Sequence, residues 1–107
     1  MKKLFVTNAF SLNMLADLSV INDIIVQPVN GSQKSLQEIL RDYPDYQSAV
    51  GHADTANVFS SVIGKSIPMN RTTVVLDTST ALLVGQYKGE RLAEGATIQW
   101  VLVELLG

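Results

Sequence analysis

The residues YQSAVGHADTANVFSSVIG, numbers 46–64, decide the fold that we predict for this chain. Tyr46–Val50 predicts a short strand or a bridging segment, and the residues after it predict a helix that ends at Gly64. Asp54 is a residue type that caps helix N-termini, and Gly64 suits the left-handed position that follows a helix. The inward face of this helix is predicted to be apolar, consisting of Val58, Phe59, Val62 and Ile63. A strand that leads into a helix is typical of α/β folds.

Further strands are predicted wherever apolar or β-branched residues run together. The expected strands are Lys3–Thr7, Asn22–Val29, Thr72–Leu76, Ala81–Tyr87 and Thr97–Leu105. Asp77–Thr80 lies between the third and fourth of these, so we expect those two strands to form a hairpin. Pro28 and Gly31 are expected to end the second strand, and Lys88–Gly95 is expected to be a polar loop.

Two further helices are predicted. Ser32–Tyr43 has Ser32 or Ser35 as a cap, and Pro44 stops it. Asn8 can cap another helix, whose apolar side consists of Phe10, Met14 and Leu15. The chain is therefore predicted to form a single small α/β (α+β) domain over residues 1–107, with a mixed sheet of about five strands and flanking helices.

The composition excludes several classes of function. The 107 residues include no cysteine, so disulfides, thiolate metal sites and cysteine nucleophiles are absent. The formal net charge is −2, and no basic face of the kind that grips long nucleic acid is visible. The first apolar run ends at Thr7, and no stretch is long enough to span a bilayer. We therefore expect a soluble, cytoplasmic protein with no membrane contact, metal or cofactor.

Charged residues make up only 17% of the chain. This fraction is below the average for globular proteins, which favours a partner chain that covers some apolar surface.

His52 is the one histidine, and it lies between the predicted strand and the predicted helix. Sites form at such junctions in α/β folds, and free N–H groups at a helix start attract phosphate. A structural or solvated histidine is the alternative interpretation. Arg71 and Arg91 flank predicted strands, and guanidinium matches the geometry of phosphate oxygens, although arginines in such places are also commonly solvated.

Polar residues near the N-terminus also allow two interpretations. Asn8, Ser11 and Asn13 are either an N-cap and polar helix surface or groups that contact a base or ribose. Spacing alone does not separate the two.

Two stretches of the sequence carry a family resemblance. Residues 7–15, TNAFSLNML, resemble the N-terminal signature of the viral anti-CRISPR ring nucleases, and residues 50–55, VGHADT, resemble their catalytic histidine block. Asn70–Arg71 and residues 91–95, RLAEG, resemble two further blocks in the same order. This family also has relatives in bacterial type III CRISPR loci.

The resemblance implies a homodimer whose interface pocket closes over cyclic tetra-adenylate, the second messenger of type III CRISPR systems. It implies that His52, Arg91 and Glu94 are catalytic. The resemblance also implies a set of ligand-binding residues, which we predict to be Asn8, Ser11, Asn13, Thr55, Arg71 and Gln86.

The implied reaction needs no metal. A 2′-hydroxyl attacks the adjacent phosphate and leaves a 2′,3′-cyclic phosphate, with His52 as the acid and Arg91 as the charge stabiliser. Glu94 either orients Arg91 or positions another group of the pocket. Two alternatives stay open: a sponge that binds cyclic oligonucleotides without cutting them, and a protein that inhibits a CRISPR effector by contact.

Overall fold

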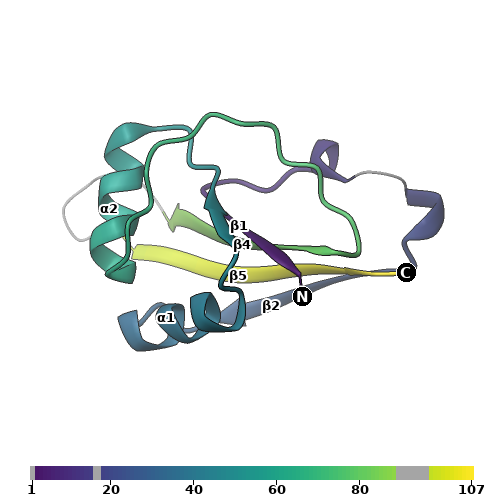
Figure 1. The fold of residues 1–107 in the computed structure, drawn as a ribbon, viewed down its shortest axis with the longest axis horizontal. Helices are drawn as coiled ribbons and strands as arrows, with labels where there is room; N and C mark the ends of the chain where they lie inside the picture. The colour runs from purple at the N-terminus through teal and green to yellow at the C-terminus, as the bar shows by residue number, and fades with distance from the viewer. Residues whose placement is uncertain (1, 16–17, 89–96) are drawn as a thin grey trace.

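The computed structural model describes residues 2–15, 18–88 and 97–107. These residues form a mixed five-stranded sheet in the order β2-β5-β4-β1-β3 (Figure 1). The strands are β1 (Lys3–Thr7), β2 (Asp23–Val29), β3 (Tyr46–Ser48), β4 (Thr80–Lys88) and β5 (Thr97–Leu106). β3, β1 and β4 are parallel, whereas β5 runs antiparallel to both β4 and β2. The predicted α+β domain with a mixed sheet of about five strands is confirmed.

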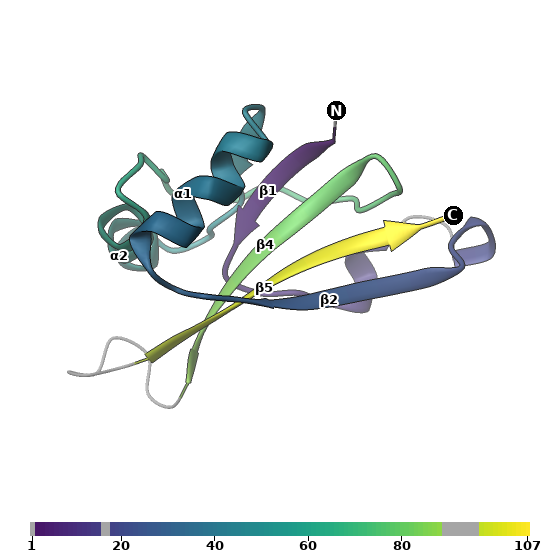
Figure 2. The same cartoon turned by 90° about the horizontal axis from the view of Figure 1, so that it is seen from below.

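Both α-helices, α1 (Gln33–Asp42) and α2 (Ala53–Ile63), pack on one face of the sheet (Figures 1 and 2). Leu36 and Leu40 of α1 are buried there beside Phe59 and Ile63 of α2. The Phe59 ring contacts Trp100 of β5, with 4.8 Å between ring centroids. Since a buried side chain of this size contributes about 1.5–3 kcal/mol, these contacts fix both helices on the sheet.

The ends of both helices follow from local chemistry. Ser32 caps α1, and its Oγ accepts a hydrogen bond from the Ser35 N–H at 3.2 Å. Gly64 ends α2 in the left-handed region, with φ of 76°, as predicted. The predicted cap of α2 is wrong, because His52 occupies the N-cap position and Asp54 lies in the first turn.

The inward face of α2 differs in part from the prediction. Phe59 and Ile63 are buried as expected, whereas Val58 and Val62 are only half-buried. Thr55 and Ala56 fill the two remaining inward positions. The Phe59 ring lies directly against Gly85 of β4, where a Cβ would lie only 2.9 Å from it.

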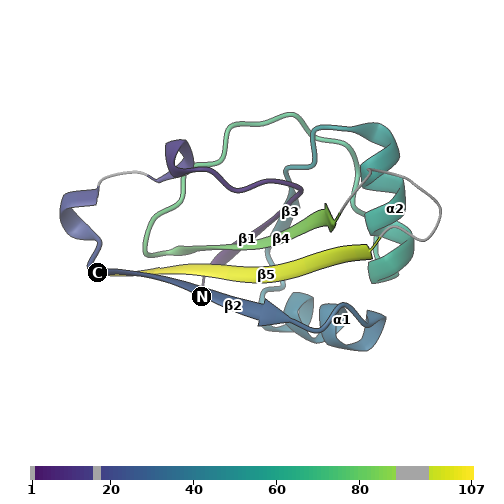
Figure 3. The same ribbon diagram turned by 180° about the vertical axis from the view of Figure 1, so that it is seen from behind.

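The opposite face of the sheet is covered by chain segments that form no α-helix (Figure 3). Residues 8–15, which include the 3₁₀ turn η1 (Leu12–Met14), lie there beside residues 70–77. A second 3₁₀ turn, η2 (Leu18–Val20), precedes β2. Leu15 and Leu76 join the two segments through an isolated bridge. Loops therefore cover the part of this face where its buried residues lie.

Two predictions for this face are wrong. The helix after Asn8 is reduced to η1, which begins after Ser11 and has no side-chain cap bond. Thr72–Leu76 forms no strand, and β4 pairs with β1 and β5 instead of with Thr72–Leu76. Val74 and Leu76 are buried while Val75 is exposed, so the alternating pattern reflects burial of one side of a covering loop.

Other predicted boundaries are closer to the structure. Val29 does end β2, but Pro28 lies within it, which β2 tolerates because it is an edge strand. Lys88 belongs to β4, and the rest of the predicted loop, 89–95, lies outside the described residues. No helix among the described residues has the length and apolar content that crossing a membrane requires.

Candidate functional site

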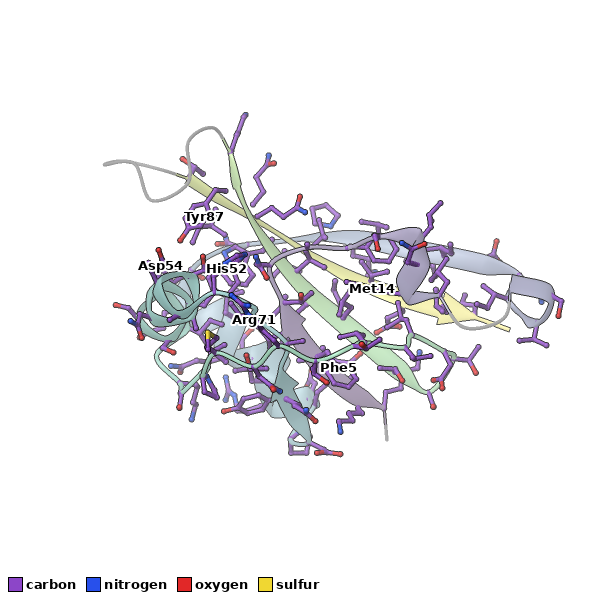
Figure 4. All side chains as sticks on the ribbon, turned by 90° about the horizontal axis from the view of Figure 1, so that it is seen from above. Phe5, Met14, His52, Asp54, Arg71 and Tyr87 are labelled. Carbon is purple, nitrogen blue, oxygen red and sulfur yellow. The ribbon has the colours of Figure 1, made fainter. Side chains whose placement is uncertain are left out.

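A polar hollow of about 640 Å³ opens at the edge of the sheet where the parallel strands β1 and β3 end. Ligand sites in α/β sheets gather at the carboxyl ends of the strands, because the loops that follow the strands meet there. The hollow is lined by Thr7, Asn8, Ala9, Met14, Ala49, Gly51, His52, Arg71, Thr72 and Thr73. Figure 4 shows His52 and Arg71 together at the start of α2.

His52 reaches this hollow from the N-cap position of α2. Its backbone carbonyl accepts the Ala56 N–H at 2.9 Å, while its side chain makes no capping bond. The imidazole is exposed and has no hydrogen-bond partner among the described residues. Helix formation therefore depends on the backbone of His52 and leaves its ring available to a ligand.

Asp54 contributes to the electrostatics of the same helix end. Its carboxylate accepts the Thr55 N–H at 3.0 Å, within the first turn of α2. A carboxylate there is favoured by the positive end of the helix dipole. It also places a negative charge two residues from His52, on the side where an anionic ligand would otherwise meet free N–H groups.

Arg71 is held at the hollow by a hydrogen bond from its Nε to the Gly51 carbonyl oxygen, at 2.9 Å. This bond uses one of the five guanidinium donors. The two terminal amino groups form no hydrogen bond with the described residues, and the side chain is exposed. The fork that matches two phosphate oxygens is therefore free to bind an anion.

The chain around Arg71 is clamped to the end of β3. Asn70 donates its backbone N–H to the Val50 carbonyl at 2.8 Å and its side-chain amide to the Ser48 carbonyl at 2.7 Å. Ser48 Oγ donates to the Pro68 carbonyl at 2.6 Å and accepts the Val50 N–H at 3.2 Å. Ser48 thus fixes the segment that carries Arg71 to the end of β3.

Of the predicted site residues, the hollow brings together three: Asn8, His52 and Arg71. Ser11 and Asn13 are exposed around η1 and do not line it. Arg91 and Glu94 lie outside the described residues.

Thr55 and Gln86 lie near the hollow without lining it. Thr55 is 1% exposed, and its hydroxyl has no hydrogen-bond partner within the part of the chain that the structure describes. Gln86 is exposed on β4, two residues beyond Val84, the partner of Thr7. Because side chains alternate along a strand, Gln86 points to the same face of the sheet as Thr7.

Sequence reasoning missed several residues of the site. Thr7, Thr72 and Thr73 also line the hollow, and Met14 supplies an apolar side chain to it. Thr72 and Thr73 were assigned to a strand, where β-branched residues are common. The signal that could have identified them is their position directly after Arg71.

Comparison with known proteins gives the context of this site. The ORF117 protein of Acidianus two-tailed virus is 36% identical over 56 residues, which cover 52% of this chain and 47% of that protein. The matched stretch thus spans about half the length of that relative.

The fold itself recurs in a solved structure, B116 of Sulfolobus turreted icosahedral virus. The match between this chain and B116 has a TM-score of 0.77 and a sequence identity of 24%, and it covers 95% of this chain and 98% of the B116 chain. Both relatives are viral proteins. The model of the STIV B116-like family matches residues 4–101, which include every residue that lines the hollow. The chain therefore belongs to the STIV B116-like family.

Proposed function

We propose that this protein is a metal-independent ring nuclease, which cleaves cyclic tetra-adenylate and so switches off type III CRISPR signalling. One observation carries the proposal: an exposed imidazole and a free guanidinium fork, from His52 and Arg71, line the same polar hollow. An acid beside a phosphate-binding cation is what cleavage of an RNA-type linkage needs. The resemblance of residues 7–15 and 50–55 to ring nucleases supports the choice of substrate.

The reaction begins when a ribose 2′-hydroxyl attacks its own 3′-phosphate, and its proton passes to solvent. The bond between phosphorus and the 5′-oxygen breaks, giving a 2′,3′-cyclic phosphate and a 5′-hydroxyl. His52 donates the proton that the leaving 5′-oxygen takes up. Arg71 binds the phosphate, Arg91 stabilises the charge that develops on it, and Glu94 orients a pocket group. The sugar must be held in line for attack, which is the task assigned to Asn8.

The proposal includes a homodimer. Five large aliphatic side chains are 41–71% exposed on the side of the molecule that no α-helix covers: Leu12, Val20, Ile24, Val26 and Val75. A second copy seated on these residues would bury them, which is favourable by about 25 cal/mol per Å². Leu12 and Val75 lie two residues from Met14 and Thr73 of the hollow. Association there would therefore also shield the hollow from water and bring two copies of His52 and Arg71 to one ring.

The test is a single-turnover assay of purified protein with labelled cyclic tetra-adenylate and excess EDTA. We expect linear products that end in a 2′,3′-cyclic phosphate, formed equally fast without metal. The informative variant is His52→Asn, because asparagine is a preferred N-cap and preserves the start of α2. It should bind the ring but cleave it about 10²–10⁴-fold more slowly, the usual contribution of a general acid.

Lys65→Ala is the matched control, because it removes an exposed side chain just beyond the other end of α2 and should leave the rate unchanged. Full activity of His52→Asn would remove His52 from the mechanism. Tight binding of the ring by the wild-type protein without any cleavage would favour the sponge. Loss of activity in EDTA would contradict the metal-independent reaction.

A further inference from the structure

A pair of glutamines continues the wall of the hollow along the sheet. On the face opposite the helices, β4 and β5 present the apolar pair Val84 and Val101, and then the polar pair Gln86 and Gln99. Side chains that face each other across antiparallel strands have Cβ atoms about 4.5–5.5 Å apart. Both glutamines are exposed, and neither side chain forms a hydrogen bond with the described residues. The two amides therefore form one polar surface.

The strand register joins this surface to the hollow. Thr7 pairs with Val84, so Gln86 lies beside the residues that follow Thr7, namely Asn8 and Ala9. Gln99 lies one strand further out, and neighbouring strands are about 4.8 Å apart. Gln86 and Gln99 thus form a pair of amides that extends from the neighbourhood of the hollow outward across β4 and β5.

Gln99 also has an open outer side. β2 ends at Val29, which pairs with Trp100, so none of the described strands pairs with Gln99 on that side. The ribbon formed by β4 and β5 continues past the end of β2, as Figure 2 shows. The exposed side chain of Gln99 is therefore accessible to a flat ligand group.

We propose that Gln99, together with Gln86, reads an adenine base of the bound ring and sets its base specificity. This inference depends on the proposed function. A glutamine amide offers one donor and one acceptor, which match the N7 acceptor and N6 donor of adenine. Uncharged amides attract phosphate only weakly. Gln86 and Gln99 therefore contribute to recognition of the base, whereas Arg71 supplies the positive charge that binds phosphate.

The experiment measures the affinity of wild-type protein and Gln99→Leu for cyclic tetra-adenylate and for the same ring built from 7-deaza-adenosine. The deaza ring lacks the N7 acceptor and retains its charges and its 2′-hydroxyls. Loss of a bidentate contact should weaken binding of the natural ring by Gln99→Leu about 5–150-fold. The wild-type protein should bind the deaza ring much more weakly than the natural ring. This loss of affinity, the deaza penalty, should be clearly smaller for Gln99→Leu.

Gln27→Leu is the matched control, since Gln27 is equally exposed on the sheet but pairs with Leu102, whose side chain packs on the helix side. Equal affinities of wild type and Gln99→Leu, or equal deaza penalties, would overturn the assignment of Gln99 while leaving the ring nuclease intact. If the wild-type protein binds neither ring, the proposed function fails, and this inference fails with it. Because the site is exposed, the melting temperature of Gln99→Leu should match that of the wild type.

Discussion

Replacing Ser48 with alanine should weaken the fold and the candidate site together. Ser48 is 5% exposed and makes two side-chain hydrogen bonds, a donation to Pro68 and an acceptance from the Val50 N–H. The first bond contributes about 1 kcal/mol net. Loss of the second leaves the N–H of a fully buried residue without a partner, which costs a further ~1–3 kcal/mol.

The expected total is about 2–4 kcal/mol, which for a domain of this size lowers the melting temperature by about 8–30 °C. Arg71 should lose its fixed position, because the segment that carries it is clamped to β3 through Ser48 and Asn70. The affinity for cyclic tetra-adenylate should therefore fall even at temperatures where the variant is folded.

Thermal unfolding by circular dichroism and ligand titration at 20 °C check both parts. Ser66→Ala is the control, because it makes the same chemical deletion at an exposed serine with no side-chain bond to the described residues. A melting temperature of Ser48→Ala within ~2 °C of that control would refute the reasoning.

Three further predictions concern packing, pH and assembly. Gly85→Ala places a Cβ 2.7 Å from Trp100 Cζ3 and 2.9 Å from Phe59 Cζ, so we expect a loss of about 1–3 kcal/mol by urea unfolding, and an unchanged midpoint would contradict the packing. Burial and the hydrogen bond to Glu104 raise the pKa of Tyr43 to about 12. The stability that this bond contributes is full below the ordinary tyrosine pKa of ~10 and is lost as the pH rises toward 12. The free energy of unfolding of Tyr43→Phe should therefore fall less than that of the wild type between pH ~10 and pH ~12. Parallel curves of unfolding free energy against pH for the two proteins would contradict this role of Tyr43. Val26→Asp should convert a dimer into a monomer by light scattering, whereas an identical mass for both proteins would exclude this side of the molecule as the interface.

Much of the fold could be predicted because local chemistry determines it. Ser32 and Gly64 mark helix ends through a hydroxyl and a missing side chain, and both act within a few residues. The apolar runs at Lys3–Thr7 and Thr97–Leu106 form strands whose apolar side chains contribute to the core of the sheet. The sequence prediction failed at Thr72–Leu76. This segment lies over the sheet with alternate residues buried, and a strand within a sheet shows the same alternation.

The candidate site was predicted in part, from residue types at a strand–helix junction. His52 was identified for that reason, but its N-cap position was assigned to Asp54, because both residues can occupy the start of a helix and aspartate has the stronger preference. Thr72 and Thr73 were missed because the strand prediction placed them in a sheet.

By itself, the sequence determined which reactive groups this protein has and where its helices begin and end: one imidazole beside a helix start, arginines of a type that binds phosphate, and helix ends set by neighbouring residues. Tertiary structure alone decided that Asn8, His52 and Arg71 meet in one hollow, and that Gln99 faces Gln86. These groups come from segments that are 19 to 63 residues apart or on different strands, so their proximity depends on strand order and register. Strand order results from burial over the whole sheet, which no short stretch of sequence encodes.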